Sequence, residues 1–535
     1  MSCTNTFQTE NILIWFADSQ TAGDFKLRLL VEADHDHLEP TLPLVGRKWM
    51  VKDIIDPNDI PNYTCISYVW GDQNTEWTNN PFYGIWGPKR ISVHTMRALE
   101  STISKFATKT LAFWIDAFCV PVAEDGDIQA VAEKQATLES MGYIYHKADK
   151  VAIVLVEESY AAIEHMIDVT ATIDQARRER LVIDKSHLAN AQKLDCLEKD
   201  GWIRSVWTYQ EVLETPTNDL SFLCEDSSKP PLLAWVSFSA IGGYITLFKQ
   251  TQQGIDQLDI RSRYPRLDAF ESLIGDLWLG GEKYGLRVMA SMNGRETTEF
   301  KNYWYAMIGA MTMERSARSV GATEQQLCQK FIDVCESKQD FSYIFSSADR
   351  QAEEVGSPAF ERQTSTKRWR PRLGQFPAIV PIHNFGTGQK GKRNEDGTLT
   401  LHDMAVYQTS GQRLCEKAKN WMTSWIERTD YLPNSVDFSI ETPDEGDPRL
   451  LIYDFLKAIG FLGSNEYLQL EDGFFFLQHA VAADAAVSVL VSTSIQYAFG
   501  APGLARRIDD DGTSWYTPGV LFGQVFKEQE LVTLT

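Results

Sequence analysis

The order of apolar and polar positions in the first half of the chain predicts short buried strands that alternate with amphipathic helices. Strands are expected at residues 25–33, 63–70, 90–93, 111–120 and 151–156. Helices are expected at residues 95–107, 130–147, 160–184, 186–199 and 200–213, and residues 74–89 are expected to form a long loop. This alternation predicts the α/β class, with a mostly parallel sheet flanked by helices.

The pattern changes after about residue 220. Helical spacing dominates up to residue 345, and the charged, Pro- and Gly-rich segment that follows is typical of a linker. The last part mixes helices with short strands. We therefore expect an N-terminal lead-in with an opening strand (1–60), an α/β domain (61–220), a helical segment (221–346), a linker or long loop (347–397) and a C-terminal α+β module (398–535).

Composition narrows the classes of partner. The net charge is −22, from 73 acidic and 51 basic residues, and this excess opposes binding to nucleic-acid phosphates and to anionic membrane surfaces. We therefore expect no nucleic-acid partner and no membrane partner. The basic run at residues 367–372 is the local exception, and we interpret it as a solvated loop.

The eight cysteines indicate no metal site and no disulfide framework. They form no CxxC pair and show no Cys/His zinc spacing, and a chain of 535 residues can bury a core without such crosslinks. The first residues lack the basic start and apolar run of a signal peptide. A reducing, cytoplasmic setting is therefore expected.

Three short blocks carry a resemblance to a known family. They are ISYVWG (66–71), FWIDAFC (113–119, with EKQ at 133–135 and then Met141, Ile144 and Tyr145) and WIRSVWTYQE (202–211). In content and order they resemble the heterokaryon-incompatibility (HET) domain of fungi. Weaker similarities follow in NYWYAMIG (302–309) and YTPGVLFGQ (516–524). The resemblance implies a part in non-self recognition and programmed cell death. Pro121-Val122 departs from it, because the family has Asn-Gln there.

Glu211 is the first candidate catalytic residue. HET domains have been likened to Toll/interleukin-1 receptor (TIR) domains, whose enzymatic members cleave NAD with a glutamate. That likeness implies NAD as a substrate, with no separate cofactor, and Glu211 as the carboxylate that stabilises the ribosyl cation. Trp207 lies four residues earlier on the predicted helix, and an aromatic neighbour would favour the acid form of Glu211. The alternative is a surface glutamate paired with Arg204.

Asp116 is the second candidate, because we place it inside an apolar strand where a carboxylate needs partners. It faces a ligand at the end of the strand, or it makes a structural hydrogen bond to a loop N–H or to Arg204. Cys119 is interpreted as a buried structural thiol.

Five side chains are candidates for substrate binding: Ser67, Tyr68, Trp70, Arg204 and Trp207. Ser67, Tyr68 and Trp70 lie at a strand end, where they would contact a sugar or a phosphate; the alternative is that the aromatic rings only fill the core. Arg204 would clamp an anionic group, or it would pair with Asp116 or Glu211. Together with Trp207, these residues are expected to converge at one end of the central sheet.

The sequence leaves three functions open. The first is a HET protein of cell death that acts on NAD or a related nucleotide, as a hydrolase. The second is an enzyme of specialised metabolism that uses a HET scaffold for a small apolar substrate. The third is a non-enzymatic signalling or scaffold module, with a protein partner or self-association.

Overall fold

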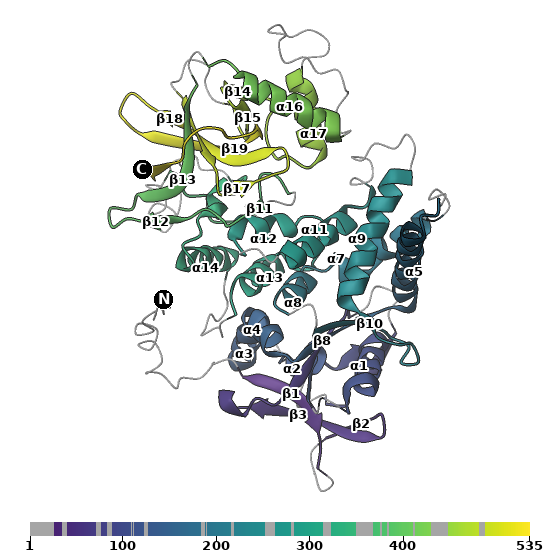
Figure 1. Cartoon of the computed structure of the whole chain (residues 1–535). Helices are drawn as coiled ribbons and strands as arrows, with labels where there is room; N and C mark the ends of the chain where they lie inside the picture. Colours follow the sequence, from purple (N-terminus) through teal and green to yellow (C-terminus); the bar gives the residue numbers. More distant parts are fainter. Residues whose placement is uncertain are drawn as a thin grey trace, which may run out of the picture.

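The structure is a computed structural model, and three parts follow one another in space (Figure 1). A sheet with its helices holds the first part of the chain, a layer of helices follows, and a second sheet holds the C-terminal part. The structure describes residues 26–34, 40–70, 76–82, 88–108, 110, 112–121, 127–182, 188, 190–215, 219–251, 263–279, 283–313, 323–348, 368–374, 377–381, 385–409, 412–429, 448–480 and 487–535.

The first sheet has eight strands in the order β10-β9-β8-β4-β7-β1-β3-β2. Their bounds are β1 Leu27–Glu32, β2 Leu42–Leu44, β3 Arg47–Ile54, β4 Tyr63–Ser67, β7 Ala112–Trp114, β8 Lys150–Leu155, β9 Leu220–Cys224 and β10 Leu232–Leu233. The central pairs β7-β4, β4-β8 and β8-β9 are parallel, and antiparallel strands extend the sheet on both sides. The predicted α/β class, with helices flanking a parallel centre, is confirmed.

Helices cover both faces of this sheet. Their bounds are α1 Val93–Phe106, α2 Asp116–Cys119, α3 Ile128–Glu139, α4 Met141–Lys147, α5 Glu157–Glu179, α6 Ala191–Lys199, α7 Gly201–Arg204 and α8 Trp207–Leu213. Along β8, Val151 and Ile153 join one apolar cluster, while Ala152 and Val154 join another with α1 on the opposite face. Both faces of the strand are therefore buried, which explains its continuous apolar run.

Several local predictions are wrong in detail, and three of them bear on the site. The strand expected at residues 111–120 ends at Trp114, because Asp116 begins the short helix α2. The helix expected at residues 130–147 divides at Ser140 into α3 and α4. Within the expected loop at residues 74–89, a short strand β5 (Trp77–Asn79) pairs with β6 (Arg90–Ser92).

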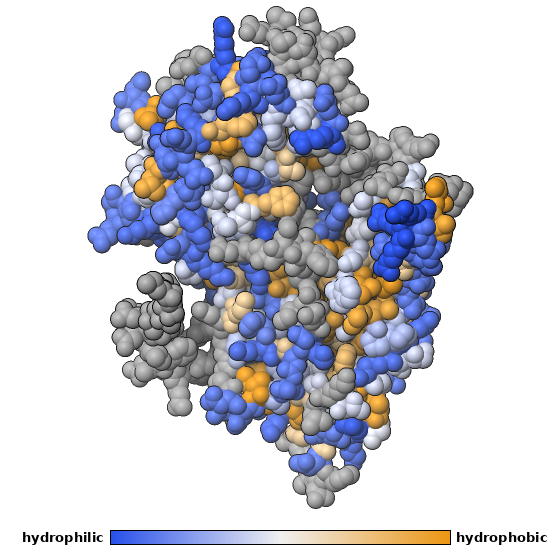
Figure 2. All heavy atoms as spheres, in the orientation of Figure 1, coloured by the Kyte–Doolittle hydropathy of each residue, from blue (hydrophilic) through white to orange (hydrophobic). Residues whose placement is uncertain are grey.

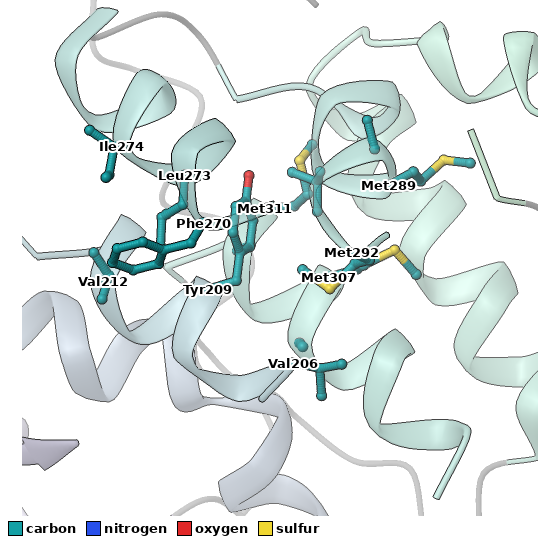
Figure 3. Packing of buried hydrophobic residues seen from close by; sticks show 14 of the residues in the cluster. Val206, Tyr209, Val212, Phe270, Leu273, Ile274, Met289, Met292, Met307 and Met311 are labelled. Carbon is teal, nitrogen blue, oxygen red and sulfur yellow. The ribbon is translucent and has the colours of Figure 1, made fainter. Parts of the chain in front are cut away.

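The helical layer follows the first sheet. Its elements are α9 Ala234–Thr251, α11 Pro265–Leu279, α12 Gly285–Ser291, α13 Lys301–Met311, α14 Glu324–Ser337 and the 3₁₀ turn η4 Ser342–Phe345. Figure 3 shows how α8 packs on it: Tyr209 and Val212 lie near Phe270 of α11, with Met307 of α13 close by. This apolar contact fixes the helix that carries Glu211.

The C-terminal part forms an antiparallel sheet in the order β12-β13-β16-β18-β19-β15-β14, with β20 paired to β13. The bounds are β11 Phe385–Gly386, β12 Gly391–Arg393, β13 Leu399–Gln408, α16 Glu416–Thr429, α17 Pro448–Ala458, β14 Tyr467–Leu470, β15 Gly473–Leu477, β16 Val487–Ser492, β17 Ile495–Gln496, β18 Gly500–Ile508, β19 Ser514–Gly523 and β20 Glu530–Leu534. Phe474 and Phe476 pack with α16 and α17, whereas Phe475 joins a different cluster, as alternation along a strand requires.

The described stretches between residues 368 and 397 are folded, with Trp369 and Val380 buried. No helix in the described part of the chain combines the length and the apolar character needed to cross a membrane.

Candidate functional site

Asp116 is held at the carboxyl end of the first sheet by residues that follow β4. The hydroxyl of Tyr68 donates to one carboxylate oxygen at 2.8 Å, and the indole N–H of Trp70 donates to the other at 2.6 Å. The backbone N–H of Ala117 donates a third hydrogen bond at 2.7 Å. Tyr68 is buried and Trp70 is 37% exposed, so the Trp70 side of this cluster is its open side.

Glu211 lies on α8 and is only 6% exposed. The hydroxyl of Ser67, the last residue of β4, donates to its carboxyl group at 2.5 Å. The indole of Trp202 in turn donates to the Ser67 oxygen at 2.7 Å, and Tyr145 of α4 also hydrogen-bonds Glu211. The interpretation of Glu211 as a surface residue is therefore wrong.

Burial raises the pKa of Glu211 to about 8. The negative charge of nearby Asp116 acts in the same direction, while the hydrogen bonds from Ser67 and Tyr145 lower that pKa. Burial also raises the pKa of Asp116, but the hydrogen bonds from Trp70, Tyr68 and Ala117 oppose this effect. The pKa values of Glu211 and Asp116 are thus both raised by burial, but hydrogen bonds from different residues oppose this effect in the two groups.

The other predicted site residues lie elsewhere. Arg204 does not pair with either carboxyl group: its guanidinium lies 3.6 Å from the carboxylate of Glu296, and the two residues are also joined through their backbones. Trp207 is partly buried and packs against the large apolar core. The structure therefore brings the carboxylates, Ser67, Tyr68 and one indole together, but not the guanidinium.

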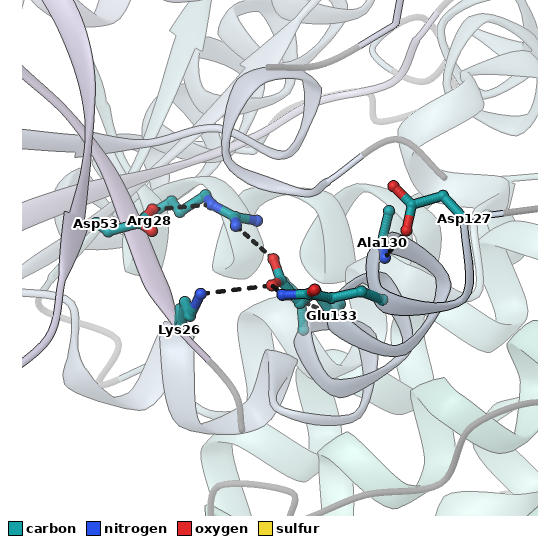
Figure 4. Close-up of polar contacts among 8 residues, drawn as sticks. Lys26, Arg28, Asp53, Asp127, Ala130 and Glu133 are labelled. Atoms are coloured by element: carbon teal, nitrogen blue, oxygen red, sulfur yellow. Dashed lines mark hydrogen bonds and ion pairs between the residues drawn. The ribbon is translucent and has the colours of Figure 1, made fainter. Parts of the chain in front are cut away.

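Other motif residues are structural. Glu133 of α3 accepts a hydrogen bond from buried Arg28 of β1 at 2.6 Å, and Arg28 also binds Asp53 at 2.9 Å (Figure 4). Lys26 lies 3.4 Å from the same glutamate. This network joins α3 to the sheet. Cys119 is buried, and burial raises the pKa of its thiol to about 12, as expected of a structural cysteine.

A cavity of about 520 Å³ lies at the carboxyl ends of β4, β8 and β9. Val69 follows β4, Leu155 ends β8 and Glu225 follows β9, and all three line it. The chain passes from β4 to β7 on one side and later to β8 on the other, so the strand order reverses here. In open α/β sheets, this reversal is where ligands bind. Trp202 and Arg204 line the cavity, whereas Glu211 and Asp116 are not among its lining residues.

Two lining residues escaped the sequence analysis. A ring nitrogen of His94, Nδ1, lies 2.9 Å from the carboxylate of Glu225, although 131 positions separate the two in the sequence. The other ring nitrogen, Nε2, is buried and has no hydrogen-bond partner among the described residues. His94 directly follows the strand predicted at residues 90–93, which was the one available signal, whereas no strand was predicted before Glu225. In the described part of the chain, no cluster of His, Cys, Asp and Glu is arranged to hold a metal ion.

Comparison with known families gives a match in the first half of the chain. Residues 63–211 match the model of the family described as heterokaryon incompatibility protein (HET). This part of the chain is similar to HET domains, and we refer to it as the HET domain. It begins at the first residue of β4 and ends at Glu211, so it contains both carboxyl groups of the cluster. No curated protein and no solved structure matches the chain. Strands β1 to β3 precede the HET domain and β9 and β10 follow it, and all five strands extend its sheet.

Proposed function

We propose that this protein serves in fungal non-self recognition and programmed cell death, in the cytoplasm, and that its HET domain hydrolyses the N-glycosidic bond of NAD or a related nucleotide. The observation that supports this most is that two carboxyl groups with raised pKa values, buried Glu211 and partly buried Asp116, lie close enough for the charge of Asp116 to act on Glu211. Such groups gather at catalytic sites, where one carboxyl stabilises positive charge and the other exchanges a proton.

The chemistry requires one bond to break and one to form. The bond between ribosyl C1′ and the pyridine nitrogen breaks, and its electrons leave with nicotinamide, which becomes neutral. The Asp116 carboxylate, whose charged form is favoured by hydrogen bonds from three donors, stabilises the ribosyl cation. Water then adds to C1′ and gives its proton to ionised Glu211, so that the products are ADP-ribose, nicotinamide and one proton. The ribose would enter on the side of exposed Trp70.

Two alternatives have less support. The cavity at the sheet edge carries charged residues such as Arg97, Lys199 and Glu158, which do not suit a small apolar substrate.

A scaffold role with a protein partner or self-association would need an apolar surface. On the face in Figure 2, hydrophobic residues gather mainly beside α9, while polar residues cover most of the C-terminal part. Exposed Leu233, the last residue of β10, and exposed Trp235 of α9 lie close together in the sequence. This small apolar surface is the observation that supports a scaffold role.

The test is to incubate the purified full chain with NAD and to measure released nicotinamide by chromatography. Glu211→Gln should reduce the rate by about 10²–10⁴-fold, which is the usual contribution of a general base. Glu214→Gln is the matched control, since Glu214 is a buried glutamate on the next turn that pairs with Lys283 at 2.7 Å. No release by the wild-type protein, or equal rates for Glu211→Gln, would contradict the proposal.

A further inference from the structure

The cavity at the carboxyl ends of β4, β8 and β9 is separate from the carboxyl cluster. Val69 and Trp202 face the cavity, whereas Tyr68 and Trp70 bind Asp116. The segment after β4 therefore divides the two sites. The volume of about 520 Å³ lies within the range of roughly 300–1,000 Å³ that is usual for small-molecule sites.

The cavity has an apolar wall. Val69, Val93, Val154 and Leu155 contribute aliphatic side chains, and Trp202 contributes an aromatic one. The Trp202 indole N–H is occupied by Ser67, so this ring offers the cavity only apolar surface. Such a wall suits a flat, weakly polar group such as a nucleobase.

Three cationic side chains contribute to the lining of the cavity. Arg97, Lys199 and Arg204 line the cavity, and the buried Nε of Arg204 has no hydrogen-bond partner among the described residues. The side chain of His94 is 11% exposed. Glu225 holds its Nδ1, and its buried Nε2 has no hydrogen-bond partner among the described residues. Helices α1 and α5 also begin here, and the N–H groups at their first turns add positive potential.

The acidic groups of the cavity have separate explanations. Glu225 is paired with His94 at 2.9 Å and with Arg97 at 3.6 Å. Asp200 caps α7 and accepts a hydrogen bond from the Trp202 backbone at 2.7 Å. Glu76 and Glu158 are exposed at the opening. Carboxylate oxygens accept hydrogen bonds, so these two groups suit the hydroxyls of a ribose.

We propose that this cavity is a nucleotide-binding site in which His94, oriented by Glu225, contacts a phosphate group together with Arg97, Lys199 and Arg204. The base would lie on the wall formed by Val69 and Trp202, and the ribose near Glu158. A nucleoside monophosphate meets all three requirements of the cavity: one anionic group, one set of hydroxyls and one flat ring. The inference concerns binding alone and does not depend on hydrolysis at Glu211.

The experiment is isothermal titration calorimetry of the full chain with adenosine 5′-monophosphate, adenosine and inorganic phosphate, each in a separate titration. We expect the monophosphate to bind at least tenfold more tightly than either fragment. His94→Gln and Arg97→Gln should each weaken its binding by tenfold or more. Glu225→Gln should also weaken it, because Glu225 orients the imidazole of His94 and pairs with Arg97.

The matched control is His165→Gln, since His165 lies on α5, outside the cavity, against Tyr244. The affinity of this variant for the monophosphate should equal that of the wild type. If His94→Gln fails to fold, Val69→Trp provides a second variant that fills the cavity and should abolish binding. The proposal is overturned if the wild type does not bind the monophosphate at millimolar concentration, if phosphate alone binds equally well, or if these variants bind normally. Binding without NAD cleavage would instead remove only the hydrolysis proposal.

Discussion

Glu211 shows how the surroundings of one residue determine its charge. Its carboxyl group accepts a hydrogen bond from Ser67, which itself binds the Trp202 indole, and it also hydrogen-bonds Tyr145 and is subject to the charge of Asp116. Burial removes the solvent that would stabilise the anion, so the proton is retained up to a pH of about 8. The sequence predicted that neighbouring aromatic residues would favour this acid form, but it named aromatic residues of the same segment, such as Trp207, which packs against the large apolar core.

This retained proton should make folding stability depend on pH. The pKa of Glu211 rises from 4.5 to about 8 on folding, so the folded state holds a proton that the unfolded state loses between these values. Stability from this group is therefore full below pH 4.5 and is lost as the pH rises towards 8, by up to about 1.4 kcal/mol per pH unit. Urea unfolding at pH 6, 7 and 8 should show a steeper loss for the wild type than for Glu211→Gln. Parallel losses would contradict the assignment.

At the scale of elements, α4 and α13 approach so closely that glycine is required. An added methyl group at Gly142 would collide with the backbone oxygens of Gly309 and Thr312. Gly309 in turn leaves room for the side chain of Gln210, on the helix that carries Glu211. These contacts position α8 and therefore the carboxyl group of Glu211.

Gly142→Ala should therefore lower the free energy of unfolding by about 1–3 kcal/mol, the usual cost of overpacking. Gly242→Ala is the control, because Gly242 lies in α9 and an added methyl group there would have no atom within 4 Å. This second change should stabilise the protein by about 0.5–1 kcal/mol through helix propensity. Thermal or urea unfolding measures both, and equal effects would refute the packing argument.

The sequence predicted elements better than it predicted contacts. Periodicity located β4, β8 and α1 because burial of one or both faces leaves a local pattern. It misplaced the end of β7, since Asp116 is satisfied by residues 46 and 48 positions away in the sequence. It could not pair His94 with Glu225, or Arg204 with Glu296, because those contacts depend on how distant segments pack.

At the scale of the molecule, one apolar core joins the parts of the chain. The same cluster includes Tyr63 of the HET domain, Phe331 of the helical layer and Leu401 and Leu504 of the C-terminal sheet. Buried Asp340 also accepts hydrogen bonds from the backbones of both regions that meet there. The parts are thus joined by interior contacts and not only by the chain.

We therefore expect the parts to unfold together. Hydrogen exchange at increasing urea, followed by mass spectrometry, should give the same midpoint for peptides of β8 and of β18. A shared midpoint would indicate one cooperative unit. Two separate midpoints would show that the HET domain folds independently of the C-terminal sheet, contrary to this expectation.

The central claim is that Glu211 acts on NAD as a buried base whose pKa is about 8. The most direct test is the pH dependence of kcat/KM for nicotinamide release, because this ratio reports the pKa of the free enzyme. Since only the ionised carboxylate accepts the proton of water, kcat/KM should rise between pH 6.5 and a plateau above about pH 8. Glu211→Gln should be slow and independent of pH over this range. A flat wild-type profile, or the same rise in the variant, would contradict the claim.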